Sequence, residues 1–538
     1  MAVVSTLIQT SLVWTTRILS GNNYLSLKIA AACYVAYKVW RVMYLLYFAP
    51  LSKIPGSKIC KVSKYKSQYH TFFGQLPYTC EDYYYRYGDI CVMGPRAVMI
   101  SNPTDCKMVL GTHKFPKNNA YRGLGVITET MFSTQSGEFS HMRRRQVGHA
   151  FNHAYVGAME PTIIECGIEA IRRKWDACID ASPSGKEATV PYALHFSLAS
   201  FDIIGALAYG ERFHALRDNT SKVVDWVTKF SALGLLRSVF KSTNWFPLSL
   251  VVRPLEKSRD EFAAFGNAAA DRRRELLKSG LLAEKPKDLL QALIDAEDPE
   301  SRVRMTQIQI TAENIGFLIG GTDTSSQTLC WTLHYMLLYP DVYSRAVEEV
   351  RGRFSRSHTI TYTEAKASLP YIDAIIFESM RIRSVSGVFL PRMVPEEGAT
   401  IQGHFLPRGT QVLVNIAGAH KHAETWDEPR LFNPDRFLGD GEKLKQNVLT
   451  FSAGVRICPG RNIAQYEMMT IFANILKDYD FELPADSLFG PDRLDKYGYP
   501  EEMPRTHGLT VFPKKPERDC QVIIRRAAES SFVSAGSS

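Results

Sequence analysis

A ten-residue segment near the carboxyl end, 451–460 with the sequence FSAGVRICPG, constrains the fold more than any other part of this 538-residue chain. Gly454 permits a tight turn, and Pro459 suits the first turn of a helix because its φ is already close to the helical value. A helical pattern then runs through residues 461–477. Cys458 is therefore predicted beside a helix amino terminus, where backbone N–H groups and the helix dipole favour a thiolate.

Three more residues of this loop argue against the commoner reading of Cys458 as an inert buried thiol. Phe451, Arg456 and Gly460 complete the pattern FxxGxRxCxG around it. A thiolate held in a turn, with glycines that let a flat ligand approach, is what axial haem ligation requires, and Arg456 is placed to pair with a haem propionate. The segment resembles the haem-binding loop of cytochromes P450. The resemblance implies one haem b, with Cys458 as the axial iron ligand.

Two segments upstream are similar to other signatures of the same family. Glu378 and Arg381 form an ExxR pair, and residues 432–437 (FNPDRF) resemble the family's PERF region with Asp435 in place of the usual glutamate. Taken alone, an ExxR pair is more often a solvated pair on a helix surface. The resemblance implies a buried triad of Glu378, Arg381 and Arg436 with a structural role, costly to break.

The pattern between residues 306 and 339 predicts a long helix, with Thr306 and Gln309 as a capping box at its start. Such a helix would be roughly 50 Å long, enough to cross a whole domain. Two adjacent glycines, Gly320 and Gly321, lie in its middle and cost about 2 kcal/mol of helix propensity relative to alanine. A packing notch for another helix is the ordinary explanation of such a pair.

The resemblance instead identifies these glycines with the family's oxygen-binding groove above the haem. Asp323 and Thr324 follow them directly and correspond to the acid–alcohol pair that delivers protons during oxygen activation. Because the pair is intact, the resemblance implies a monooxygenase that inserts oxygen by hydroxylation or epoxidation. Two alternatives are an electron-independent haem-thiolate isomerase or dehydratase, and a non-enzymatic haem sensor.

Two further arginines are candidate propionate ligands. The segment 138–145 (EFSHMRRR) resembles the helix on the cysteine side of the haem, and alignment on residues 150–151 places Arg144 at the propionate position. The family's usual aromatic or histidine partner falls on Ser140, so that second partner is left open. We expect one arginine of the run to point inward and the others outward, toward an acidic electron donor. Arg392 resembles the arginine that reaches a propionate from a strand.

An almost continuous apolar and aromatic run occupies residues 29–49. As a helix it would span about 31 Å, close to the thickness of the hydrocarbon core of a membrane. Lys38 and Arg41 interrupt the run, so a helix that lies on the membrane, or a core helix, is an alternative to a single span. Five lysines between positions 53 and 66 place the bulk of the chain on the cytosolic side by the positive-inside rule. We expect residues 1–49 to form a membrane-anchor region.

Composition supports a globular enzyme and excludes several other classes. Hydrophobic residues make up 45% and charged residues 22%, which are ordinary values for a packed domain. A net charge of +9 is too small to argue for nucleic-acid binding. None of the ten cysteines forms a CxxC pair, which argues against zinc ribbons and thioredoxin-type sites. We expect one haem domain over 50–515 and a disordered tail over 516–538.

The predicted architecture is mainly α with a smaller β region. Helical periodicity is clearest over residues 161–178, 222–239, 256–278, 306–339 and 461–477, and strand-like stretches over 89–93, 97–101, 399–405 and 410–415. The resemblance covers roughly residues 50–515 and implies the cytochrome P450 fold for them.

The resemblance also implies partners and a location. The chain has no flavin or nicotinamide motif, so electrons are expected from NADPH through a separate NADPH–cytochrome P450 reductase, with cytochrome b5 as a second candidate donor. The anchor resembles that of single-pass members of the endoplasmic-reticulum membrane, with a cytosolic catalytic domain. Residues 112–135, 384–390 and about 500–510, with the helix before Gly320, are expected to face a lipophilic substrate. As a whole, the sequence resembles fungal members of the family that act in secondary metabolism, on substrates such as terpenoids or polyketides.

Overall fold

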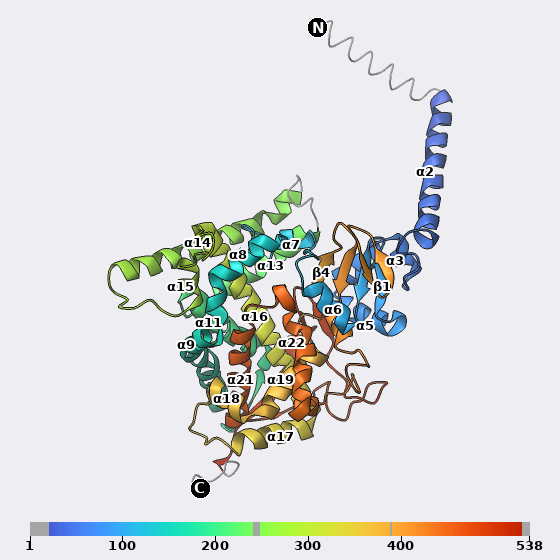
Figure 1. The fold of residues 1–538 in the computed structure, drawn as a ribbon. Coiled ribbons are helices and arrows are strands. Elements are labelled where there is room, and N and C mark those ends of the chain that lie inside the picture. The colour runs from blue at the N-terminus through green and yellow to red at the C-terminus, as the bar shows by residue number, and fades with distance from the viewer. Residues whose placement is uncertain (1–20, 240–247, 388–389, 530–538) are drawn as a thin grey trace.

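The computed structural model of this protein describes residues 21–239, 248–387 and 390–529. A helical body carries several small sheets, and one long helix projects from it (Figure 1). The predicted mainly α architecture with a smaller β region is confirmed. Residues 1–20 of the expected anchor region, residues 388–389 of an expected substrate-facing segment, and residues 530–538 of the expected tail lie outside the described residues.

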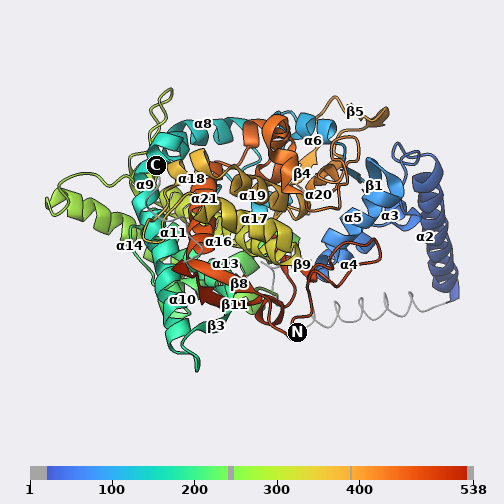
Figure 2. The same cartoon turned by 90° about the horizontal axis from the view of Figure 1, so that it is seen from below.

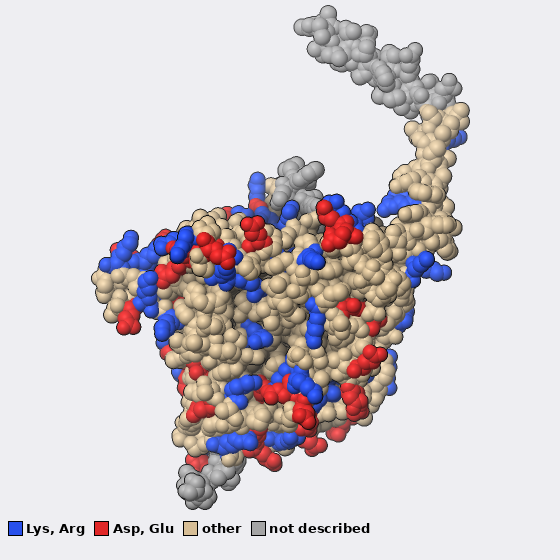
Figure 3. All heavy atoms as spheres, in the orientation of Figure 1, with Lys and Arg blue, Asp and Glu red and all other residues tan. Residues whose placement is uncertain are grey.

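The projecting helix is α2 (Gly21–Tyr47), which stands apart from the body in both ribbon views (Figures 1 and 2). Its side chains from residue 24 to 43 are exposed, and its surface is almost free of charge in the space-filling view (Figure 3). The stretch Tyr24–Tyr47 is long and apolar enough to cross a membrane. The helix therefore fits a membrane anchor, although it starts earlier than the predicted residue 29 because the polar residues before that position continue the helix.

One other helix passes the same test of length and hydropathy, α11 (Tyr192–Tyr209). It is almost entirely buried and packs along α16 (Gln307–Leu338), the central helix of the body. Apolar residues on every side of α11 thus reflect a core position rather than a membrane span. The capping box of Thr306 and Gln309 at the start of α16 is present as predicted.

The other long helices largely follow the predicted periodicity. α13 (Lys222–Val239) and α21 (Arg461–Asp478) have nearly the predicted limits, and α14 (Leu248–Lys278) begins earlier. The expected helix 161–178 is longer, because α9 (His153–Ile164) runs through a π-helical turn into α10 (Ala170–Asp180). The shorter helices are α3 (Lys58–Val62), α4 (Tyr65–Phe72), α5 (Leu76–Tyr87), α6 (Pro103–Leu110), α7 (Ala120–Leu124), α8 (Gly137–Val147), α12 (Ala215–Asp218), α15 (Leu289–Ile294), α17 (Pro340–Arg351), α18 (Tyr362–Ser368), α19 (Pro370–Ile382) and α20 (Ile416–Ala419).

The largest sheet has the strand order β1-β2-β7-β4 and covers a second, smaller core. Its strands are β1 (Ile90–Gly94), β2 (Ala97–Ile100), β4 (Leu390–Met393) and β7 (Gln411–Val414). Only β2 and β7 run parallel, with Val98 opposite Val412. The strand predicted over 399–405 is instead a hairpin of β5 (Ala399–Ile401) and β6 (His404–Leu406), because Gln402 and Gly403 both have positive φ and form a tight turn.

The carboxyl-terminal segment is a correction to the predicted domain limits. Helix α22 (Pro516–Asp519) and strand β11 (Gln521–Arg526) follow residue 515, and β11 is the central strand of a sheet with β3 (Glu187–Pro191) and β8 (Tyr479–Glu482). The buried, alternating Val522 and Ile524 explain this order. The disordered tail expected from 516 is therefore wrong for the described residues, and the domain extends past 515. A short pair, β9 (Arg505–His507) and β10 (Val511–Pro513), completes the β structure of the described residues.

Candidate active site

The cysteine loop ends where α21 begins, as the sequence predicts. The backbone N–H of Cys458 donates to the carbonyl of Phe451 at 2.8 Å, which closes the loop, and Gly460 caps the helix. Gly454 has a φ of +62°, and a Cβ there would lie 2.3 Å from the Cα of Gly111. Only glycine fits this position, because both the backbone conformation and the neighbouring chain exclude a side chain.

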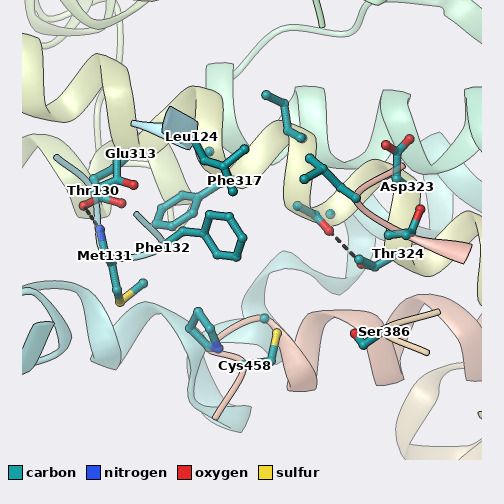
Figure 4. Close-up of a pocket in the computed structure, with 18 of the residues that line it drawn as sticks. Leu124, Thr130, Met131, Phe132, Glu313, Phe317, Asp323, Thr324, Ser386 and Cys458 are labelled. Carbon is teal, nitrogen blue, oxygen red and sulfur yellow. Dashed lines mark hydrogen bonds between the residues drawn. The ribbon is translucent and has the colours of Figure 1, made fainter. Parts of the chain in front are cut away.

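The side chain of Cys458 opens into a cavity of about 400 Å³ (Figure 4). Burial raises the pKa of this thiol, while backbone N–H groups of Gly460 and Arg461 and the charge of Arg144 act in the opposite direction. A ligand that binds the thiolate would lower the pKa of Cys458 further. The site therefore favours an occupant with an electron-accepting centre at the sulfur.

All four segments expected to face a substrate contribute to the cavity wall. Most lining side chains are apolar, among them Leu124, Val126, Ile127, Met131, Phe132, Phe317, Val385, Leu390 and Leu509. Helix α13 also lines the cavity through Phe230, Ser231 and Gly234, which the sequence analysis did not anticipate. Its amphipathic pattern predicts a helix but does not indicate what covers its apolar face.

Asp323 and Thr324 face the cavity from α16, on the side across from Cys458 (Figure 4). The hydroxyl of Thr324 donates to the carbonyl of Gly320 at 2.6 Å, and burial raises the pKa of Asp323. A Cβ at Gly320 would meet no atom within 4 Å, whereas one at Gly321 would lie 2.5 Å from Ile204 Cγ1. Only Gly320 leaves room beside the reactive side chains, and Gly321 lets α11 approach α16.

Four cations gather on the rim of the same cavity: Arg144, Arg392, Arg456 and Lys117. Arg392 and Lys117 are almost fully buried, and none of the four forms an ion pair with a described carboxylate. Burial lowers the pKa of Arg456 to about 10, with further lowering by Arg392 and Arg144. The pKa of Lys117 is lowered well below its usual range by burial and by the same three arginines. The cluster thus holds positive charge that the described protein does not neutralise.

The partners that these cations do have are weak or backbone acceptors. Arg456 donates to the carbonyls of Thr134 and Ser136, each at 3.2 Å. Arg392 donates to the Tyr121 hydroxyl at 3.5 Å. Buried cations are normally paired with anions, so this cluster fits a ligand with at least two negative charges. A thiol that opens into a largely apolar cavity and a dianion-binding rim together fit haem b, with its iron and two propionates.

The three consecutive arginines of α8 differ from the prediction. Arg143 is fully buried and its Nε lies 3.3 Å from Glu313 Oε1, while Arg144 donates to the carbonyl of Ile457. Arg145 alone lies near the surface, where it pairs with Asp298 at 2.6 Å. Two arginines therefore point inward instead of one, because a carboxylate on α16 provides a buried partner that the local sequence does not reveal.

Glu378, Arg381 and Arg436 meet behind the cysteine loop. The guanidinium of Arg381 donates twice to Glu378 at 2.7 Å, and Arg436 Nε donates to Glu378 Oε1 at 3.0 Å. Arg381 also donates to the carbonyls of His420, Pro429 and Leu431. Every side of this buried cluster is occupied by protein groups, which leaves no direction for a ligand.

Comparison with known proteins decides the family. The family described as Cytochrome P450 matches residues 64–494. The chain belongs to the cytochrome P450 family. This membership implies a haem-thiolate enzyme that uses a redox partner and acts on a small molecule, so the protein is a cytochrome P450 monooxygenase.

Two similar proteins with curated names come from one fungus. The chain is 40% identical to cytochrome P450 monooxygenase helB1 of Aspergillus fumigatus, over 94% of this chain and 87% of the relative. It is 38% identical to helB2 of the same fungus, over 90% of this chain and 96% of the relative. Among solved structures, the haem domain of cytochrome P450DA aligns with a TM-score of 0.67 at 20% identity, over 86% of this chain and 94% of that one. That likeness shows the cytochrome P450 fold.

Three buried polar residues of this cytochrome P450 were not predicted from its sequence: Lys117, Glu313 and Glu467. Glu467 lies on α21, accepts a hydrogen bond from Ser200, and has its pKa raised to about 7 by burial. Burial likewise raises the pKa of Glu313 to about 7, although its hydrogen bond from Met131 and the charge of Arg143 lower it. For Glu313 and Glu467 the available signal was a charged residue within an apolar helix pattern, but such residues are usually exposed.

Proposed function

We propose that this cytochrome P450 inserts one oxygen atom from dioxygen into a lipophilic small molecule, by hydroxylation or epoxidation. The observation that carries the proposal is a single apolar cavity onto which Cys458, the four cations, Asp323 and Thr324 all open. Haem b would be held there by Cys458 through the iron and by Arg144, Arg392 and Arg456 through its propionates, with the loop residues Phe451, Gly454 and Gly460 shaping its surroundings. Bound in this way, haem supplies the activation of dioxygen.

The protein's own part in the reaction is proton delivery and exclusion of water. Burial raises the pKa of Asp323, so its carboxyl retains a proton at higher pH than an exposed one and is suited to donate it. The Thr324 hydroxyl, held by the Gly320 carbonyl, stands next to it on the cavity wall and passes a proton at Oγ1. Apolar walls around this pair keep bulk water away from the reacting atoms.

The assignment of partners and setting rests on the family and on the anchor. Electrons would come from NADPH through a separate reductase, with cytochrome b5 as a second candidate donor. The exposed apolar α2 supports a single-pass endoplasmic-reticulum location with a cytosolic catalytic domain. The role in secondary metabolism, with terpenoids or polyketides as the substrate class, rests on the resemblance of the sequence to fungal members, and fungal relatives at 40% and 38% identity agree with a fungal type of enzyme. The Asp323–Thr324 pair on the cavity wall favours oxygen insertion over isomerisation, dehydration or haem sensing.

The first test is the CO-difference spectrum of the reduced protein in membranes, wild type beside Cys458→Ser. We expect a strongly red-shifted Soret band in the wild type and its loss in Cys458→Ser, because serine cannot provide a thiolate. Cys178→Ser, a half-buried cysteine that does not line the cavity, should keep the band. Product carrying one atom from labelled dioxygen, formed only with NADPH and reductase, would then establish the reaction class. An unchanged spectrum in Cys458→Ser would refute the ligand assignment.

A further inference from the structure

One face of α16 lines the cavity for three helical turns. Glu313, Gly316 or Phe317, Gly320 and Thr324 follow one another along it at spacings of three or four residues, and all five residues border the cavity. Eleven residues turn a helix about 20° past three full turns, so Glu313 and Thr324 project to the same side, about 16 Å apart along the axis. A Cβ added at Gly316 or Gly320 would meet no atom within 4 Å. The face thus has open space at its two glycines, a carboxylate at one end and the hydroxyl at the other, with the Phe317 ring between these ends (Figure 4).

The carboxylate at the far end of this face has one oxygen without a partner. Glu313 Oε1 accepts the backbone N–H of Met131 at 2.7 Å and lies 3.3 Å from Arg143 Nε. Oε2 accepts no hydrogen bond from any described residue, although Glu313 is only 3% exposed. Arg143 Nη2 is also buried without a partner. A carboxylate oxygen that faces a cavity from a side chain so little exposed, and that lacks a protein partner, is left to water or to another occupant of the cavity.

The surrounding charges determine what kind of occupant fits. Arg143 already balances the charge of Glu313, and Lys117 adds an amine to the cavity wall. An ammonium group would therefore find no unbalanced negative charge here, whereas a neutral hydroxyl needs none. Leu124, Phe132 and Phe317 give the wall near Glu313 a largely apolar character, and Thr130 is the neutral polar side chain labelled beside them in Figure 4. A molecule that satisfies this site is lipophilic and carries a hydroxyl near one end.

We propose that Glu313 Oε2 accepts a hydrogen bond from a substrate hydroxyl, so that the substrate is a lipophilic alcohol extended along α16. This inference rests on the proposed function and specifies its substrate class. The hydroxyl end is held beside Arg143 and Met131, and the carbon that reacts lies near Thr324, about three helical turns away. Glu313 is a specificity residue in this arrangement, and oxidation is directed to the end of the substrate remote from its hydroxyl.

The test compares 1-dodecanol with its methyl ether, 1-methoxydodecane, in the haem-loaded protein at pH 8. The extended chain of either probe is about as long as this face of α16, and only the alcohol donates a hydrogen bond. We expect wild type to bind the alcohol about 10-fold or more tighter than the ether, by calorimetric titration. In Glu313→Gln the preference should fall to near unity, because the amide still accepts from Met131 but also donates to an ether oxygen.

Two controls keep the result interpretable. Ser231→Ala removes another polar group of the cavity wall and should leave the preference intact. The double variant Glu313→Met with Arg143→Met replaces the buried pair by apolar groups, should fold, and should lose the preference. Equal binding of alcohol and ether by wild type, or a preference that survives in Glu313→Gln, would overturn the inference. Titration needs neither reductase nor turnover, so an alcohol that binds as expected but is not oxidised would count against the proposed function alone.

Discussion

Two groups of charged side chains in this protein differ in one respect. In the triad of Glu378, Arg381 and Arg436, every charged group faces an opposite charge or a carbonyl oxygen. In the cluster around Arg392 and Lys117, four cations share a cavity rim with no ion-paired carboxylate among the described residues. The first group is complete within the protein, and the second is complete only with an anionic ligand.

This difference distinguishes charged residues that stabilise the fold from charged residues that bind a ligand, without reference to any family. Removing one member of a closed group leaves its partners buried and unpaired, so the fold is destabilised. Removing one member of an open group of like charges relieves repulsion in the empty site, so the cost appears only when the ligand binds. Stability and ligand affinity should therefore respond in opposite ways at the two places, and variants can test that.

The largest effect is expected at the triad. Arg381→Met would leave Glu378 buried with half of its partners, at a cost of about 3–5 kcal/mol in the free energy of unfolding. The measurement is urea unfolding together with the yield of protein showing the thiolate CO band. Arg345→Met is the matched control, because its ion pair with Asp435 is about half exposed and should contribute less than about 1 kcal/mol. Equal stability of the two variants would show that the closed group is not structural.

Glu467, a buried carboxyl group without a cationic partner among the described residues, can be compared with the paired Glu378 of the triad. Glu467 has a pKa of about 7 against 4.5 for an ordinary glutamate, because of burial. Its folded-state pKa is the higher one, so its contribution to stability is full below about pH 4.5 and is lost as pH rises through about 7, a fall of about 3 kcal/mol. In Glu467→Gln this part of the pH dependence should vanish, whereas the exposed Glu442→Gln should keep it. An identical slope in both variants, measured by urea unfolding from pH 5 to 8, would contradict the prediction.

At the open cluster, Arg392→Met should separate haem affinity from protein stability. We expect haem to dissociate about 10-fold faster or more, as measured by transfer to apomyoglobin, because a charge-assisted contact is lost. The haem-free protein should unfold at an unchanged or higher temperature, since one of four like charges is gone. Arg408→Met, exposed and paired with Glu396, should change neither quantity. Destabilisation of the haem-free protein would mean that Arg392 belongs with the closed, structural kind of cluster.

The smallest effect is expected from two threonines of α16 that make the same bond. Thr322 donates to Leu318 at 2.8 Å and Thr324 to Gly320 at 2.6 Å, but only Thr324 borders the cavity. Thr324→Ala should slow product formation by about 10-fold and release more peroxide per NADPH consumed, because a proton donor is lost. Thr322→Ala should leave the ratio of product to peroxide unchanged. Equal coupling in both variants would remove Thr324 from proton delivery.

Much of the fold could be read from local signals. The limits of α13 and α21, the capping box at Thr306, and the positions of β1, β2 and β7 follow from periodicity and end signals that depend on neighbouring residues. Errors arose where a local signal was weak or ambiguous. The turn at Gln402 and Gly403 divides a strand-like run, and the short β11 resembles a frayed end until β3 and β8 pair with it.

The cysteine loop, the helix after it and the spacing of the ExxR pair can be predicted from the sequence alone, because each depends on conformational preferences within about ten residues. Which charges are paired depends on how distant segments come together. Arg143 turns inward because Glu313, far along the chain, lies beside it on α16, whereas no carboxylate of the described residues forms an ion pair with Arg144 or Lys117. Burial of a charge depends on partners brought from distant segments, and no local pattern encodes them.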